Sequence, residues 1–208
     1  MITIDALRIC DGERTPLDGV TMLLTANAVH GIAGEGRSEL LRAVYGLAVP
    51  ESGSVTSGGH PLRRRDMAYL EAEPRFWPGL TAGDCLGLVR RYHPASDPAP
   101  LLRRLPVPPA AEAAALPPNE RKRLALILLL DEPFCGLDAE SVFVVQQLIL
   151  QLGCEGRTLL VAADSLALLD GICDDLYVLG GGGVRGRYEH YEFARAVREA
   201  AASGIAEK

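Results

Sequence analysis

The sequence predicts an α/β fold, a mainly parallel sheet with helices on both faces, preceded by antiparallel strands at the N-terminus. Short apolar runs such as "LALILLL" (residues 124–130) and "TLLVAAD" (158–164) alternate with stretches at helical spacing. Such runs are typical of strands that are buried on both faces of a parallel sheet. Apolar and polar positions alternate over residues 1–33, which predicts antiparallel strands that lead into a buried strand.

The predicted elements follow one another in a regular order. Antiparallel strands lead into a buried strand that ends near Gly31, and a helix with its apolar residues at helical spacing begins at Arg37. A strand group around residues 66–73 comes next, followed by a helix from its N-cap Thr81 to about Tyr92. The chain continues with a strand at 124–130, a helix at 139–152, a strand at 158–164, a short helix and a strand at 175–180.

Length and composition favour one domain over residues 1–208, with a reduced helical subdomain at 81–118. A chain of 208 residues can bury one sizeable core. Residues 94–118 hold eight of the fourteen prolines, which exclude one continuous helix; a small helical lobe and a flexible insertion are the alternatives. The net charge of -6 argues against nucleic acid as a partner, and the longest apolar run is too short to cross a bilayer. Any membrane contact is therefore expected through a partner.

The stretch "GIAGEGRSEL" (residues 31–40) has the spacing of a phosphate-binding loop between a strand and a helix. Glycines at these positions let backbone N–H groups turn toward phosphate oxygens, and the helix N-terminus adds partial positive charge. Ser38 stands where a hydroxyl would bind Mg²⁺. The candidate nucleotide-binding residues are Gly31, Gly34, Glu35, Gly36, Arg37, Ser38 and Glu39. The alternative is an ordinary strand-to-helix turn.

Two acids follow the apolar run at residues 124–130. An aspartate at the tip of a buried strand can hold Mg²⁺, and a neighbouring glutamate can orient or deprotonate water. Asp131 is therefore a candidate magnesium ligand together with Ser38, and Glu132 is a candidate general base. The alternative is that the two acids simply end a strand in solvent. The phosphate-loop spacing at residues 31–40 argues against this alternative.

Together these motifs resemble the ATP-binding subunits of ABC transporters, whose core is a P-loop NTPase-like sheet, and the resemblance covers nearly the whole chain. The stretch "DEPFCGLDAES" (131–141) is similar to the family's Walker B motif and D-loop, with Asp138 as the D-loop aspartate. Residues 159–184 resemble the stretch around the switch histidine. The resemblance implies an ABC-type nucleotide-binding domain that takes ATP and Mg²⁺. It also implies two partners at the cytoplasmic face of the cell membrane: a membrane permease and a second ATP-binding subunit, in either a heterodimer or a homodimer.

Several positions depart from the family's pattern. Arg37 replaces the lysine of the phosphate loop, Ala72 replaces the Q-loop glutamine, and Asp164 replaces the switch histidine. The signature that binds another nucleotide's γ-phosphate falls on "LPPNE" (116–120), and the loop "CDGER" (10–14) has no aromatic residue to stack on adenine. The family's residues remain at Ser38, Asp131, Glu132 and Asp138.

One segment before the two acids is unusually short. The stretch "ERKRLAL" (120–126) runs directly into the apolar residues before Asp131, whereas the family has a longer helix and a turn there. Either the helix is shortened by roughly two turns, or residues are absent from the chain. The sequence leaves both alternatives open.

The departures predict a catalytically impaired member of the family, a pseudo-ATPase that serves as a structural or regulatory partner of a permease. Arginine keeps the charge of lysine but not its compact shape, and a carboxylate at Asp164, in the switch-histidine position, would repel phosphate. Glu132 leaves the alternative of an active though slow ATPase that energises transport, and nucleotide binding without turnover is another. A soluble ABC protein of translation or DNA repair usually has a second nucleotide domain or a long coiled-coil insertion, which the sequence lacks.

The aromatic pair in "PRFWPGL" (74–80) has two interpretations. The resemblance places Phe76 and Trp77 where the family's helical lobe meets the permease, and exposed aromatic residues make good anchors. The alternative is that both are ordinary core residues.

Overall fold

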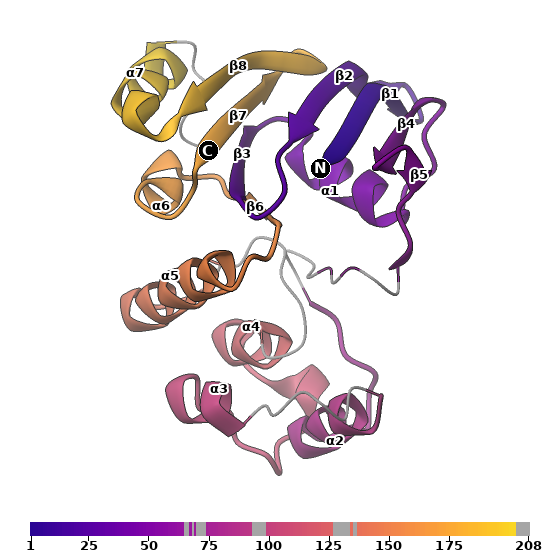
Figure 1. The fold of residues 1–208 in the computed structure, drawn as a ribbon. Coiled ribbons are helices and arrows are strands. Elements are labelled where there is room, and N and C mark those ends of the chain that lie inside the picture. Colours follow the sequence, from indigo (N-terminus) through magenta and orange to yellow (C-terminus); the bar gives the residue numbers. More distant parts are fainter. Residues whose placement is uncertain are drawn as a thin grey trace. The chain divides into compact units, whose positions relative to one another are not determined.

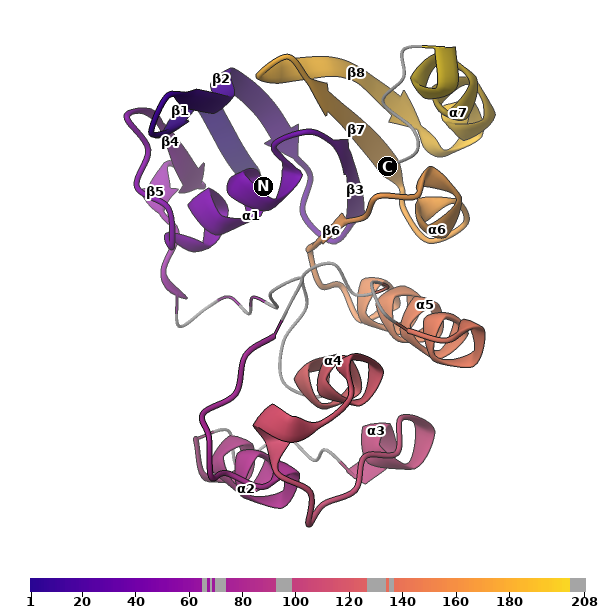
Figure 2. The same ribbon diagram turned by 180° about the vertical axis from the view of Figure 1, so that it is seen from behind.

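The computed structural model describes residues 1–64, 67, 69, 74–92, 99–126, 134 and 137–202. The chain divides into two compact units, which are considered separately (Figures 1 and 2). The first unit comprises Met1–Ala68 and Leu148–Lys208, and the second comprises Tyr69–Gln147.

An antiparallel sheet opens the first unit, and the alternation of residue types predicts the two strands before α1 (Arg37–Tyr45) but not the two strands after it. Its strand order is β2-β1-β4-β5, formed by β1 (Ile2–Asp11), β2 (Arg14–Leu24), β4 (Ser52–Ser57) and β5 (His60–Pro61). Strand β1 buries both Ile4 and Leu7 because its register shifts between them, at Ala6, whose φ of 43° is left-handed. A β-bulge of this kind adds one residue and returns the next side chain to the core.

The second sheet of the first unit is mainly parallel. Strand β3 (Val29–Gly34) lies between β6 (Leu159–Ala162) and β7 (Asp175–Gly180) and is parallel to both. All residues of β7 are buried, as its apolar run predicts. The sequence did not predict β8 (Gly183–Glu189), which pairs antiparallel with β7 after a tight turn at Gly181 and Gly182, both with positive φ.

Helices lie on both sides of β3, which confirms the predicted α/β class. Helix α1 (Arg37–Tyr45) packs on β2, β3 and β6, and it ends at Gly46, whose N–H donates to the carbonyl of Ala43. Helix α6 (Leu166–Leu169) lies on the opposite side of β3 from α1 in both views, and α7 (Phe193–Ala202) packs on β8. This arrangement places the start of α1 directly after the central strand.

The second unit is built from helices. They are α2 (Ala82–Tyr92), α3 (Ala99–Arg104), a short 3-10 helix (Ala113–Ala115), α4 (Pro118–Leu126) and the first part of α5 (Ala139–Cys154). Their core contains Ala82, Cys85, Leu86, Val107, Ala113, Leu116 and Leu124. The hydroxyl of Thr81 accepts from the N–H of Asp84, and the carboxylate of Asp84 accepts from the N–H of Thr81. This capping box confirms Thr81 as the N-cap of α2, whereas the boundary of the subdomain at 81–118 stays a prediction.

The strand predicted from Leu124 was wrong at its start. The residues 124–126 form the end of α4, where Leu124 is fully buried in the helical core. An apolar run alone does not distinguish a buried helix from a buried strand. The rest of that predicted strand, residues 127–130, and most of the strand group at 66–73 lie outside the described residues.

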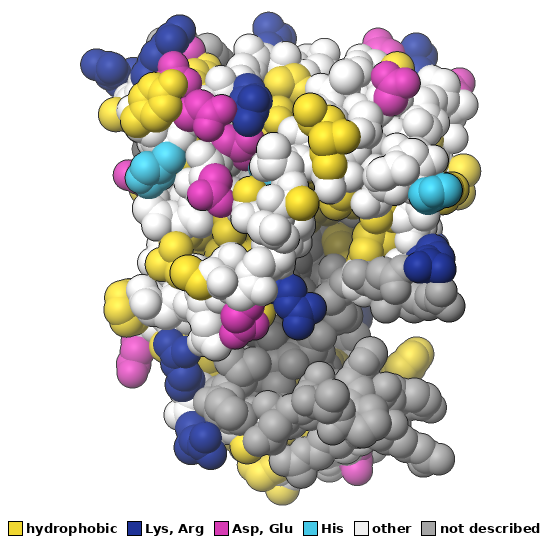
Figure 3. All heavy atoms as spheres, viewed as in Figure 1, with side chains coloured by type: hydrophobic (Ala, Val, Ile, Leu, Met, Phe, Trp, Pro, Cys, Tyr) yellow, Lys and Arg dark blue, Asp and Glu magenta, His cyan; other side chains and the backbone are white. Residues whose placement is uncertain are grey.

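The described surface carries mixed charge. Figure 3 shows basic and acidic side chains interspersed among the described residues of one face, so charge of one sign does not concentrate in that described part. Among the described helices, none combines the length and the apolar character that a bilayer crossing requires.

Candidate functional site

The turn that joins β3 to α1 has two residues, Glu35 and Gly36. Strand β3 runs to Gly34, so the predicted strand end near Gly31 was wrong by three residues. Gly31 lies inside the strand, buried, and is paired with β6 on one side and β7 on the other. In a phosphate-binding loop, the residues after the first glycine are free to turn their N–H groups inward. Here the first three of those residues, 32–34, belong to the sheet.

The fold itself requires glycine at Gly34 and Gly36. Both residues have left-handed φ angles, 95° and 89°. A Cβ atom on Gly34 would lie 2.1 Å from the carbonyl oxygen of Leu179, and one on Gly36 would lie 2.7 Å from the carbonyl oxygen of Pro16. Backbone atoms cannot move aside as a flexible side chain can. The glycine pattern therefore has a structural cause that involves no ligand.

The guanidinium of Arg37 folds back over the turn. Its Nη1 donates to the carbonyl oxygen of Gly34 at 3.1 Å, and its Nη2 forms an ion pair with the carboxylate of Asp164, which follows β6. The side chain of Arg37 is 21% exposed and that of Asp164 is 62% exposed. The structure thus brings together two predicted site residues that are 127 positions apart in the sequence.

This ion pair places a carboxylate where Arg37 would otherwise hold an anion. Because Asp164 is largely exposed, the pair contributes little to stability. Its chemical effect is greater, since the planar guanidinium directs its N–H groups toward Asp164 and the Gly34 carbonyl. Glu35 in the turn and Glu39 in the first turn of α1 add two more acids, which suit the helix dipole but repel an approaching anion.

The predicted magnesium site is described only at Ser38. This residue is the second of α1 and is half-buried. The other predicted ligand, Asp131, lies outside the described residues, as do Glu132 and Ala72. The magnesium site and the general base therefore stay predictions.

The signature position lies in the second unit, at the start of α4. Pro117 and Pro118 have no backbone N–H. The N–H of Glu120 donates to the side-chain oxygen of Asn119 at 2.9 Å, and the N–H of Arg121 donates to the carbonyl of Pro117 at 2.8 Å. A helix N-terminus binds anions through such N–H groups, so this one has fewer of them to offer.

Asp138, the residue at the D-loop position, caps α5 within the second unit. Its Oδ1 accepts from the N–H of Ser141 at 2.9 Å, and its Oδ2 pairs with the guanidinium of Arg123 on α4. The guanidinium also donates from Nε to the hydroxyl of Ser141 at 3.1 Å. The bond from the Ser141 N–H lowers the pKa of Asp138 below its ordinary value. Sequence reasoning did not single out Arg123, because its partners lie 15 and 18 positions away on another helix.

A strand, a glycine turn and a helix follow one another on a mainly parallel sheet. This order is that of the P-loop class of α/β proteins. No protein-family model matches the chain. The aliphatic sulfonates import ATP-binding protein of Pseudomonas entomophila is 31% identical over 199 residues, which cover 86% of this chain and 72% of that protein. The chain therefore belongs to the family of ABC transporter ATP-binding proteins.

A further relative agrees with this assignment, and a solved structure agrees with the fold. The ABC transporter ATP-binding/permease protein Rv1747 of Mycobacterium tuberculosis is 31% identical over 213 residues, 83% of this chain but 23% of that protein. A solved structure of an ATP-binding subunit of an ABC transporter matches with a TM-score of 0.83 and 20% identity, covering 95% of this chain and 93% of that one. The chain spans between 23% and 65% of the length of four curated relatives.

Proposed function

We propose that this chain is an ATP-binding-subunit-like component of an ABC transporter in which ATP hydrolysis is strongly impaired, and that it acts as a structural or regulatory partner of a membrane permease. The observation that carries the proposal is the ion pair between Arg37 and Asp164. Both residues stand at positions where the family binds phosphate, and here they neutralise each other.

The short turn supports the same proposal. Two residues between β3 and α1 provide little backbone to surround a phosphate group. A triphosphate in the position that the motif requires would also compete with Asp164 for the Arg37 guanidinium. The described residues therefore fit the phosphate groups of ATP poorly, and we expect binding to be weak.

The expected loss of rate is large. Removing one preorganised donor from the developing charge of a transition state costs about 3–4 kcal/mol, or two to three orders of magnitude in rate. The altered residues here include Arg37 in the first unit and the prolines at the signature position in the second. Residues of one site act as a unit, so the individual losses are not added together.

The proposed partners are an integral membrane permease and a second ATP-binding subunit, at the cytoplasmic face of the cell membrane. Within the second unit, Phe76 packs partly buried against the helical core, whereas Trp77 is 78% exposed. Of the two interpretations of this aromatic pair, core suits Phe76 and a partner anchor suits Trp77. Recovery of the chain with an integral membrane protein in a native purification tests this part of the proposal.

Hydrolysis is tested with the full chain and its Glu132→Gln variant, which lacks the candidate general base. We expect the two proteins to show the same magnesium-dependent rate of ATP hydrolysis, because the altered phosphate positions limit the wild type already. A rate in the wild type that clearly exceeds that of Glu132→Gln would instead establish the second candidate function, a slow ATPase that energises transport. The retained Glu132 is the observation that favours this second candidate.

A further inference from the structure

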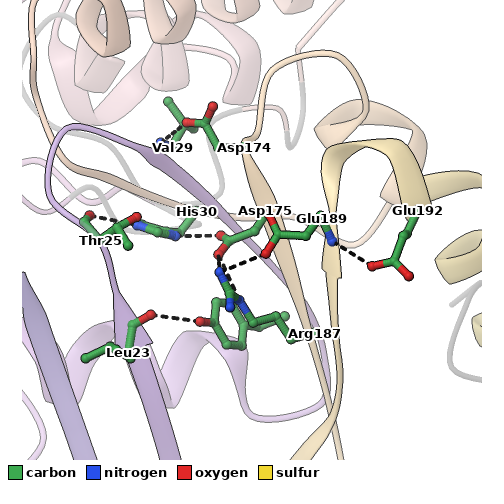
Figure 4. A network of polar contacts seen from close by, with 10 residues as sticks. Leu23, Thr25, Val29, His30, Asp174, Asp175, Arg187, Glu189 and Glu192 are labelled. Carbon is green, nitrogen blue, oxygen red and sulfur yellow. Dashed lines mark hydrogen bonds and ion pairs between the residues drawn. The ribbon is translucent and has the colours of Figure 1, made fainter.

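A histidine is completely buried near the start of strand β3. The side chain of His30 is 0% exposed, and both of its ring nitrogens have partners (Figure 4). Nδ1 lies 2.5 Å from Oδ1 of Asp175 on β7, and Nε2 lies 3.0 Å from the carbonyl oxygen of Thr25 in the connection between β2 and β3. This histidine thus links the central strand to two other segments of the first unit.

The partners of His30 determine its protonation state. A carbonyl oxygen only accepts hydrogen bonds, so Nε2 must carry a hydrogen to bond Thr25. Asp175 receives two further N–H donors from Arg187 of β8, at 3.1 Å from Nε and 2.8 Å from Nη2. A charged guanidinium bound in this manner favours the ionised carboxylate. An ionised Asp175 also accepts only, and Nδ1 must therefore carry a hydrogen as well.

The charges around His30 favour the same state. Two acidic residues face His30: Asp175 on β7, and Asp174 immediately before β7. Arg187 on β8 pairs with Asp175 and also with Glu189. Burial lowers the pKa of His30, but the hydrogen bonds to Asp175 and Thr25 and the two acidic charges outweigh burial and raise the pKa above its ordinary value of 6.5. A neutral imidazole has one N–H and would leave one of these contacts without a proton.

We propose that His30 is a buried imidazolium at neutral pH that positions β3, the strand that carries the candidate turn, and that its deprotonation at alkaline pH loosens this strand. The proposal does not rest on ATP binding or hydrolysis. When His30 loses its proton, Arg187 remains bound to Asp175. The contact that is lost is therefore one of the two that His30 makes from β3. His30 is in this sense a positioning residue.

The direction of the pH dependence follows from the raised pKa. The contribution of His30 to stability is fully present below its unfolded pKa of about 6.5 and is lost as the pH rises through the folded value. Between the two values the equilibrium constant for unfolding rises about tenfold per pH unit. The pKa of Asp175 is shifted in the opposite direction. Burial raises this pKa, but the hydrogen bonds from His30 and Arg187 outweigh burial and bring it below its ordinary value. Asp175 therefore loses its contribution to stability only as the pH falls into the acid range.

The proposal is tested by nitrogen-15 NMR of the histidine rings in the full chain at pH 7.5. We expect His30 to show two protonated ring nitrogens and to titrate above pH 6.5, whereas a single protonated nitrogen would overturn the proposal. Unfolding equilibria from pH 6 to 9 give a second readout. The wild type and the control His60→Gln, which alters an exposed histidine, should share the alkaline loss of stability, and His30→Gln should lack it. An unchanged slope in His30→Gln would also overturn the proposal, and the NMR titration of the wild type decides it if that variant does not fold.

Discussion

Replacing Asp175 with alanine is expected to lower the free energy of unfolding by about 3–5 kcal/mol, because a buried ion pair that loses one partner leaves an uncompensated charge. Asp175 is 2% exposed and lies between the imidazole of His30 and the guanidinium of Arg187. The substitution removes the only carboxylate that both cations share within the network of Figure 4. Denaturant unfolding of the full chain at pH 7 measures the effect.

The matched control for this prediction is Asp18→Ala. Asp18 also pairs with an arginine, Arg8, but the carboxylate is 57% exposed, so water replaces the lost partner. We expect the control to stay close to the wild type. If Asp175→Ala unfolds at the same denaturant concentration as Asp18→Ala, the buried network does not stabilise the sheet as described.

Replacing Gly34 with alanine is the second change with a large expected effect. A left-handed backbone costs a residue with a Cβ atom about 1–2 kcal/mol, and forcing an extra group into a packed site costs about 1–3 kcal/mol. The new Cβ atom would meet the carbonyl oxygen of Leu179 in β7, so β3 and β7 would have to separate. Together these costs predict a loss of about 2–5 kcal/mol in unfolding free energy.

Gly183→Ala is the control for the added methyl group. Gly183 begins β8 in the same unit, its φ lies outside the left-handed range, and a Cβ atom there would meet no atom within 4 Å. The control should therefore unfold like the wild type or be slightly more stable. Equal stability of Gly34→Ala and the wild type would contradict the structural account of the glycine pattern.

Much of the fold follows from the sequence because its strands differ in pattern. Continuous apolar runs predicted β6 and β7. The alternation over residues 1–33 predicted the antiparallel strands β1 and β2 but not β4 and β5, which follow α1. The end of β3 was wrong because the glycines that permit a phosphate loop also permit a tight turn, and the choice between them depends on pairing with β7. Strand β8 was missed because its alternating pattern contains Gly186 and charged residues and it has no apolar run.

The sequence predicted which residues belong to the candidate site but not which of them contact one another. Sequence patterns identified Arg37 and Asp164 as separate departures from one family pattern. Their ion pair joins positions 127 residues apart, and only the parallel pairing of β3 with β6 brings them together. Arg123 carries no motif, so its bonds to Asp138 and Ser141 could not be expected from the sequence. Likewise, the charge of His30 depends on partners from β7 and from the connection before β3.

The proposed function requires that the turn after β3 has kept the glycines of a phosphate loop but no longer binds phosphate. Calorimetric titration of the full chain with ATP and Mg²⁺ measures this binding, with Ser38→Ala as the matched variant. We expect no saturable binding in the micromolar range and no difference between the two proteins. Micromolar, magnesium-dependent binding by the wild type that Ser38→Ala abolishes would show that the turn still binds nucleotide.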